Sequence, residues 1–105
     1  MFRTISMRQL EHLLNQTRDF LLLDVREPEE YRRGCLEGAV NLPLEQIQEA
    51  AEVISRDRPV VVYCAHGNKS LLASRELDRM GYDTVNAAGG LQYYRGNHLV
   101  RPDSG

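Results

Sequence analysis

The sequence is poor in cysteine and has no apolar stretch long enough to span a membrane. Two cysteines in 105 residues do not make a disulfide framework, and in a reducing compartment a free cysteine is more often catalytic or structural. Residues Met1 to Ser6 lack the apolar block of a secretory signal peptide. We therefore expect a cytoplasmic protein with no membrane partner.

The sequence also lacks a large excess of charge of either sign. Its 13 basic and 15 acidic residues are interspersed and give a net charge of −2, so we expect no nucleic-acid partner. The three histidines and two cysteines show no paired spacing typical of metal ligands, and Cys64-Ala65-His66 is only a weak approach to one. We expect no metal and no other cofactor.

The length of 105 residues suits one hydrophobic core region, so residues 1–105 are predicted to form a single domain. Strands and helices alternate along the chain, which favours an α/β fold with a central, mainly parallel, five-stranded sheet flanked by helices on both faces. Strands are predicted at residues 2–5, 20–23, 39–42, 60–63 and 84–86, and helices at 7–14, 28–33 and 45–54, with another ending near Gly81 and a closing turn at 91–94. Residues 101–105 are predicted to be a mobile polar tail.

The stretch with the most chemical information is an apolar run that ends in a cysteine. Val60–Tyr63 has the β-branched and aromatic residues of a strand buried on both faces, and Cys64 follows at once. A short loop then leads into a helix, whose N-terminus presents unpaired backbone amides. These amides, together with Lys69, would favour the reactive thiolate of Cys64. The alternative is that Cys64 is a small buried residue of the core.

Asp24 and Arg26 follow a second buried strand, Phe20–Leu23. In open parallel sheets, ligands bind at the carboxyl ends of the strands, so both side chains could face the same crevice as Cys64. The alternative for Asp24 is an ion pair that ties the strand end to the next helix.

With these residues identified, the chain resembles the single-domain rhodaneses, a family of sulfurtransferases. The resemblance begins at Asp24-Val25-Arg26, includes Cys64–Ser70 and Gly89-Gly90, and covers nearly the whole chain in the family's order. The other matching positions are Glu30, Tyr31, Gly34, Gly38, Ala39, Asn41 and Pro43.

The resemblance implies a rhodanese fold and a catalytic cysteine, Cys64, that carries sulfur as a persulfide. Asp24 and Arg26 would support the site, and His66 would either act on the acceptor or point outward. The implied donor is thiosulfate, a polysulfide or a protein persulfide, and the implied acceptor is cyanide or a thiol, including that of a partner protein. The implied substrate-binding residues are Ala65, His66, Gly67, Asn68, Lys69 and Ser70.

Three positions depart from the family pattern. Lys69 stands where active members often have arginine, which keeps the charge but loses the planar fork that binds oxyanions in a bidentate manner. Cys35 stands where histidine is common, and it is either a resolving thiol for the persulfide or a core residue. Tyr94 replaces a frequent tryptophan.

Two related classes of anion-binding loop do not fit. Phosphatases with a similar cysteine loop have an arginine six residues after the cysteine, and that position is Ser70. A P-loop is excluded because Tyr63 and Asn68 occupy its glycine positions. The remaining alternative to an enzyme is a rhodanese-like binding, regulatory or persulfide-carrier module with little turnover.

Overall fold

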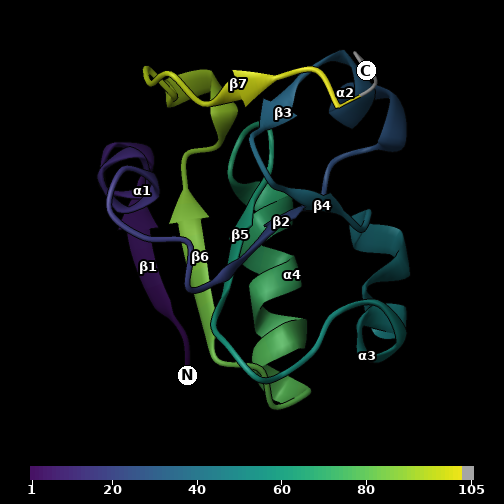
Figure 1. The fold of residues 1–105 in the computed structure, drawn as a ribbon. Coiled ribbons are helices and arrows are strands. Elements are labelled where there is room, and N and C mark those ends of the chain that lie inside the picture. The colour runs from purple at the N-terminus through teal and green to yellow at the C-terminus, as the bar shows by residue number, and fades with distance from the viewer. Residues whose placement is uncertain (103–105) are drawn as a thin grey trace.

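The computed structural model describes residues 1–102, and its centre is a parallel sheet with the strand order β1-β6-β5-β2-β4 (Figure 1). Every pairing between these five strands is parallel. The α/β fold with a five-stranded sheet is therefore confirmed. The strands are Arg3–Ser6 (β1), Leu21–Asp24 (β2), Val40–Asn41 (β4), Val60–Tyr63 (β5) and Thr84–Ala88 (β6).

Helices cover both faces of the sheet, as the sequence predicts. Val61 and Tyr63 of β5 pack into one core with α1, whereas Val60 and Val62 pack into the opposite core with α4. This two-sided burial explains why β5 has no polar alternation. No helix within residues 1–102 is long and apolar enough to cross a bilayer. The helices are Met7–Leu14 (α1), Pro28–Arg33 (α2), Ala50–Val53 (α3) and Asn68–Arg79 (α4), with 3₁₀ turns at Leu44–Glu49 (η1) and Leu91–Tyr93 (η2).

The single helix predicted over residues 45–54 is wrong. The structure has the 3₁₀ turn η1 followed by the four-residue helix α3. Leu44, Ile47 and Ala50 recur every three residues on the inner side, which matches the three residues per turn of a 3₁₀ helix. Ala51, which α-helical spacing over residues 45–54 would place on the inner side with Ile47 and Ile54, is exposed.

Sequence analysis also missed a small second sheet. Cys35–Leu36 (β3) pairs antiparallel with Leu99–Val100 (β7), above the carboxyl ends of the central strands in Figure 1. Strands of two residues carry no periodic pattern, so neither segment was recognisable. Of the tail predicted to be mobile, residues 103–105 lie outside the described residues, whereas Arg101 directly follows β7.

The segment that leads into β7 is attached to α1 through Glu11. The Tyr94 hydroxyl donates to Glu11 Oε1 at 2.5 Å, and the Asn97 amide donates to Oε2 at 3.3 Å. The His98 amide in turn donates to the Tyr94 hydroxyl at 2.8 Å. Burial, and then the hydrogen bond to Glu11, raises the pKa of Tyr94 to about 12. Burial alone would raise the pKa of Glu11, but these donors hold it below its ordinary value.

We predict that Glu11→Gln loosens residues 94–100, because the neutral amide is a weaker acceptor for these donors. The lowered pKa of Glu11 means that its contribution to stability is present above pH 4.5, its ordinary value, and is lost as the pH falls through the folded pKa. Hydrogen exchange at the amides of Asn97 and His98 should be faster in the variant at pH 7. Unchanged exchange at both amides would contradict this account.

Candidate functional site

Cys64 lies immediately after β5, at the carboxyl edge of the sheet. Its sulfur accepts hydrogen bonds from the backbone amides of Gly67 at 3.0 Å and Ser70 at 3.2 Å. The residue is 1% exposed, and it lines a pocket of about 220 Å³. Two amide donors on one sulfur stabilise negative charge there, as the N-terminus of α4 does with its partial positive charge.

The loop between β5 and α4 is very short. Only Ala65–Gly67 is irregular, because Asn68, Lys69 and Ser70 already form the first turn of α4. Gly67 has φ +97°, a left-handed conformation that favours glycine, and a Cβ there would stand 2.9 Å from the amide nitrogen of Gly89. This turn points the amides of residues 67 and 70 back toward Cys64.

The turn at Gly89-Gly90 supports the loop from the other side. The Leu91 amide donates to the Cys64 carbonyl at 2.9 Å, and the Gln92 amide donates to the Ala65 carbonyl at 3.2 Å. Gly90 has φ +77°, and a Cβ on it would collide with the carbonyl group of Ala65. The glycine pair thus allows a close approach of two backbone segments, the turn at residues 89–90 and the loop after β5.

We predict that Gly90→Ala lowers the free energy of unfolding by about 2 kcal/mol or more, because it adds a backbone collision to an unfavourable φ. Gly34→Ala is the matched control, since its backbone is extended and the nearest atom to an added Cβ is 3.8 Å away. Urea denaturation of both variants measures the difference. Equal stability of the two variants would contradict the packing described.

Asp24 and Arg26 form a buried ion pair. The Arg26 Nη2–Asp24 Oδ2 distance is 2.7 Å, and the Tyr63 hydroxyl donates to the same carboxylate at 2.8 Å. Arg26 Nη2 also donates to the Gly34 carbonyl at 2.6 Å, at the end of α2. Asp24 therefore ties the end of β2 to the end of α2 through Arg26, which agrees with the ion-pair alternative for Asp24. Arg26 also lines the Cys64 pocket.

This network fixes the protonation of its members. Burial alone would lower the pKa of Arg26, but the hydrogen bonds and charge of Asp24 outweigh burial and raise it. Burial, followed by the charge of Asp24, raises the pKa of the Tyr63 hydroxyl. Arg26 thus remains a fixed cation at the wall of the pocket.

The Lys69 ammonium forms an ion pair with a carboxylate outside the loop that follows Cys64. Its ammonium lies 3.5 Å from Glu27 Oε2, and both side chains are partly exposed. Glu45 belongs to the same group of charges, because a hydrogen bond with Glu27 and the charge of Lys69 help to lower the pKa of Glu45, after its own backbone amide. The cation predicted from the sequence is therefore partly neutralised.

The other predicted loop residues take different positions. Ala65, His66 and Asn68 line the pocket, and His66 is exposed. The Ser70 hydroxyl donates to the Gly67 carbonyl at 3.2 Å, so Ser70 faces the sulfur with its amide and not with its side chain. Sequence reasoning missed Glu30, which also lines the pocket. Its place in the first turn after a strand's carboxyl end is the signal that would have indicated it.

Cys35 is buried in β3, with 2% exposure. Burial, and then the negative charge of Asp24, raises the pKa of its thiol, which opposes the thiolate that a resolving cysteine needs. These surroundings favour the core interpretation of Cys35. Within residues 1–102, no group of three His, Cys, Asp or Glu side chains could hold a metal ion.

Comparison with known proteins identifies the family of this site. A model of the rhodanese-like domain matches residues 6–97. The thiosulfate sulfurtransferase PspE of Escherichia coli is 42% identical over 72 residues, which are 67% of this chain and 69% of that protein. A tRNA sulfurtransferase of Desulfurococcus amylolyticus is 42% identical over 77 residues, 73% of this chain but only 15% of that longer protein. A crystal structure of a rhodanese-related protein from Thermoplasma volcanium superposes with a TM-score of 0.79 and 30% identity, over 94% of this chain and 98% of that one.

Proposed function

Because the chain belongs to the rhodanese-like domain family and is a rhodanese-type sulfurtransferase, we propose that Cys64 carries the transferred sulfur atom as a persulfide. The observation that supports this role most directly is the pair of amides, Gly67 and Ser70, that donate to Sγ of Cys64. Donors already aimed at a sulfur anion need no reorganisation during the reaction.

The first half-reaction loads the cysteine. The Cys64 thiolate attacks the outer sulfur of thiosulfate, a bond forms between that sulfur and Sγ, and sulfite leaves with the electron pair of the broken S–S bond. Charge is conserved, and neither an oxidant nor a general base is needed. The product is an anionic persulfide in the pocket that Arg26 lines.

Thiosulfate as donor is supported by the name of PspE, a thiosulfate sulfurtransferase. A dianion entering this pocket meets the fixed guanidinium of Arg26 and the partly paired ammonium of Lys69. A pocket of about 220 Å³ suits a small inorganic anion rather than a large organic donor.

The second half-reaction unloads the cysteine. A nucleophile such as cyanide or a thiolate attacks the outer sulfur, and the bond between that sulfur and Sγ breaks. Its electron pair returns to Sγ, so the Cys64 thiolate is regenerated and stabilised by the same two amides. His66 is exposed and lines the pocket, so an acceptor that enters from solution can contact it.

A module that holds a persulfide with little turnover is the second candidate. The ion pair between Lys69 and Glu27 favours it, because it weakens the attraction of the site for an anionic donor. The two candidates share the loaded state of Cys64 and differ in the rate at which it forms and discharges.

We predict that Cys64→Ser abolishes thiocyanate formation from thiosulfate and cyanide, because an alkoxide does not form at neutral pH. Intact-protein mass spectrometry after mixing with thiosulfate should show a gain of one sulfur atom in the wild type and none in the variant. Cys35→Ser is the control and should keep both the mass gain and the turnover. Activity that survives Cys64→Ser would exclude the mechanism, and a mass gain without turnover would favour the module.

We further predict that Glu27→Gln lowers the KM for thiosulfate about threefold, because it removes the carboxylate that neutralises Lys69. The difference should shrink in 1 M salt, where screening is strong. Glu52→Gln, on the exposed side of α3, is the matched control and should leave KM unchanged. A KM that stays the same in Glu27→Gln would show that Lys69 does not contact the donor.

A further inference from the structure

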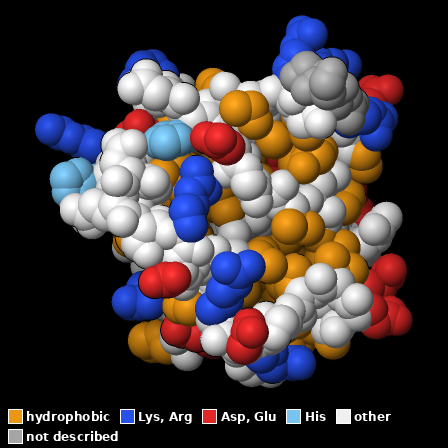
Figure 2. Space-filling view, viewed as in Figure 1, with side chains coloured by type: hydrophobic (Ala, Val, Ile, Leu, Met, Phe, Trp, Pro, Cys, Tyr) orange, Lys and Arg blue, Asp and Glu red, His pale blue; other side chains and the backbone are white. Residues whose placement is uncertain are grey.

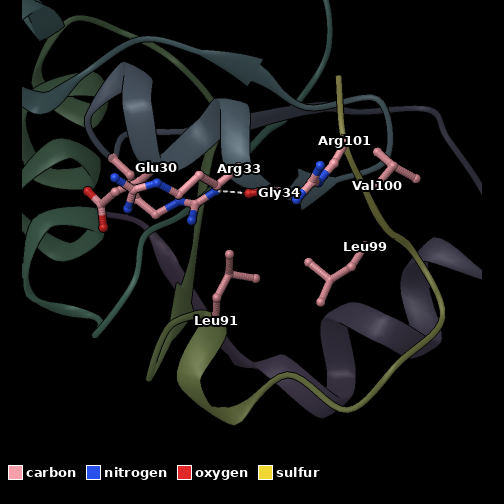
Figure 3. Close-up of a pocket in the computed structure, with 8 residues that line it drawn as sticks. Glu30, Arg33, Gly34, Leu91, Leu99, Val100 and Arg101 are labelled. Atoms are coloured by element: carbon pink, nitrogen blue, oxygen red, sulfur yellow. Dashed lines mark hydrogen bonds between the residues drawn. The ribbon is translucent and has the colours of Figure 1, made fainter. Parts of the chain in front are cut away.

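The cavity drawn in Figure 3, of about 520 Å³ between α2, η2 and β7, belongs to the site already described, because Arg26 and Glu30 line both it and the Cys64 pocket. Another cavity of about 520 Å³ shares no lining residue with either of them. We refer to it as the Arg18–Arg58 cavity, after two of the residues that line it. Its contents are therefore a separate question from the chemistry of the sulfur.

The Arg18–Arg58 cavity lies at the amino end of β2, whereas the Cys64 site lies at the carboxyl edge of the sheet. Leu21 and Leu22, the first two residues of β2, line it. In the pairing of β2 with β4, only Leu23 and Asp24 have partners, so β4 leaves this half of the strand uncovered. The end of the sheet is open here to a ligand.

One part of the wall is apolar. Leu14, Phe20 and Leu22 belong to the core on the α1 side, and Leu21 and Val40 pack as partly buried residues on the core of the α4 side. Pockets for organic molecules of moderate size are on the order of 300 to 1,000 Å³, and this cavity falls inside that range. It suits a molecule with an apolar body better than a bare inorganic ion.

The rest of the wall carries more positive than negative charge. Arg18, Arg58 and His98 line it, against one carboxylate, that of Glu37. Arg18 Nη1 donates to the Glu37 carbonyl at 2.8 Å, a neutral acceptor that holds the guanidinium without cancelling its charge. The Glu37 carboxylate is 62% exposed and lies 3.5 Å from His98 Nδ1. Within residues 1–102, Arg58 is exposed and makes neither an ion pair nor a hydrogen bond.

The two kinds of wall lie side by side on the surface. In Figure 2, basic side chains (Lys or Arg) and His border hydrophobic ones over the region where β2 lies in Figure 1. A cleft lined mainly by charge of one sign attracts ligands of the opposite sign. A molecule with an anionic group on an apolar body therefore matches the Arg18–Arg58 cavity better than a neutral or a cationic one.

We propose that the Arg18–Arg58 cavity binds a small organic carboxylate with an apolar body. The guanidinium groups of Arg18 and Arg58 attract its carboxylate, and its body packs on Leu21 and Val40. Binding makes and breaks no covalent bond. The inference goes beyond the proposed function and does not depend on a persulfide at Cys64.

The first test locates the ligand by nuclear magnetic resonance on the ¹⁵N-labelled wild type, with octanoate as the probe at pH 7. Titration should shift the amide signals of residues 20–22 and 37–40 in a saturable way and leave those of residues 65–70 in place. Absence of a saturable shift would contradict the proposal, as would shifts confined to residues 65–70.

Two analogues separate the roles of the charge and of the apolar body. Octanamide has the same chain without the charge, and its Kd should be about fivefold higher than that of octanoate. Butyrate has the same charge on a shorter chain, and its Kd should be about tenfold higher or more, because less apolar surface leaves water. An analogue that binds as tightly as octanoate would refute the assignment of the corresponding wall.

The double variant Arg18→Gln/Arg58→Gln should raise the Kd for octanoate about fivefold or more and leave the Kd for octanamide unchanged. Arg75→Gln, at an exposed position of α4 outside the lining, is the matched control and should bind octanoate as the wild type does. Equal octanoate affinity in the two variants would exclude the arginines as the carboxylate site. If thermal unfolding shows that the double variant is not folded, Arg58→Gln alone, at an exposed position, should raise the Kd about twofold.

Two further results would identify a different occupant and overturn the proposal. Sulfate that binds as tightly as octanoate would mean an anion site without selectivity for an apolar body. Shifts of the same amide signals on dilution of the protein, without octanoate, would mean that a second copy of the chain covers the cavity. Neither result bears on Cys64, whose gain of sulfur is measured separately by mass spectrometry.

Discussion

The structure depends on one constraint, namely that parallel strands deliver their carboxyl ends to the same edge of a sheet. In the β2–β5 pairing Asp24 lies opposite Tyr63, so the residue after each strand enters the same small volume. Backbone geometry thereby places the Arg26 guanidinium near the Cys64 sulfur, although 38 positions of sequence separate them. The side chains then need only short-range contacts to complete the site.

Those contacts also link the two hydrophobic cores of the molecule. Tyr63 belongs to the core on the α1 side, and its hydroxyl donates to Asp24. Cys64, the next residue, belongs to the core on the α4 side. The alternation of side chains along the chain thus directs Tyr63 and Cys64 to opposite faces of the sheet, and Arg26 at the carboxyl edge lies near both.

The sequence predicted the parts of the fold in which local pattern and tertiary environment agree. Val60–Tyr63 and Phe20–Leu23 are buried on both faces, and their unbroken apolar character follows directly from that burial. The turn at 44–49 was mistaken for α-helix because a spacing of three residues is shared by both helix types over one or two turns. The strands β3 and β7 are too short to show any sequence period, and only their pairing defines them.

For the candidate site, the position of Cys64 was predictable from the strand that precedes it. The pairing of Lys69 with Glu27 was not, because it joins residues 42 positions apart on separate elements.

The near-complete burial of Cys64 restricts what can reach its sulfur. At 1% exposure, the sulfur offers almost no open surface, so a reactant has to enter the pocket of about 220 Å³ to meet it. In the proposed loaded form, the persulfide extends the side chain by one S–S bond, about 2 Å. The walls of the pocket therefore select reactants by size, and a broad protein surface does not touch the sulfur unless a narrow part of it enters.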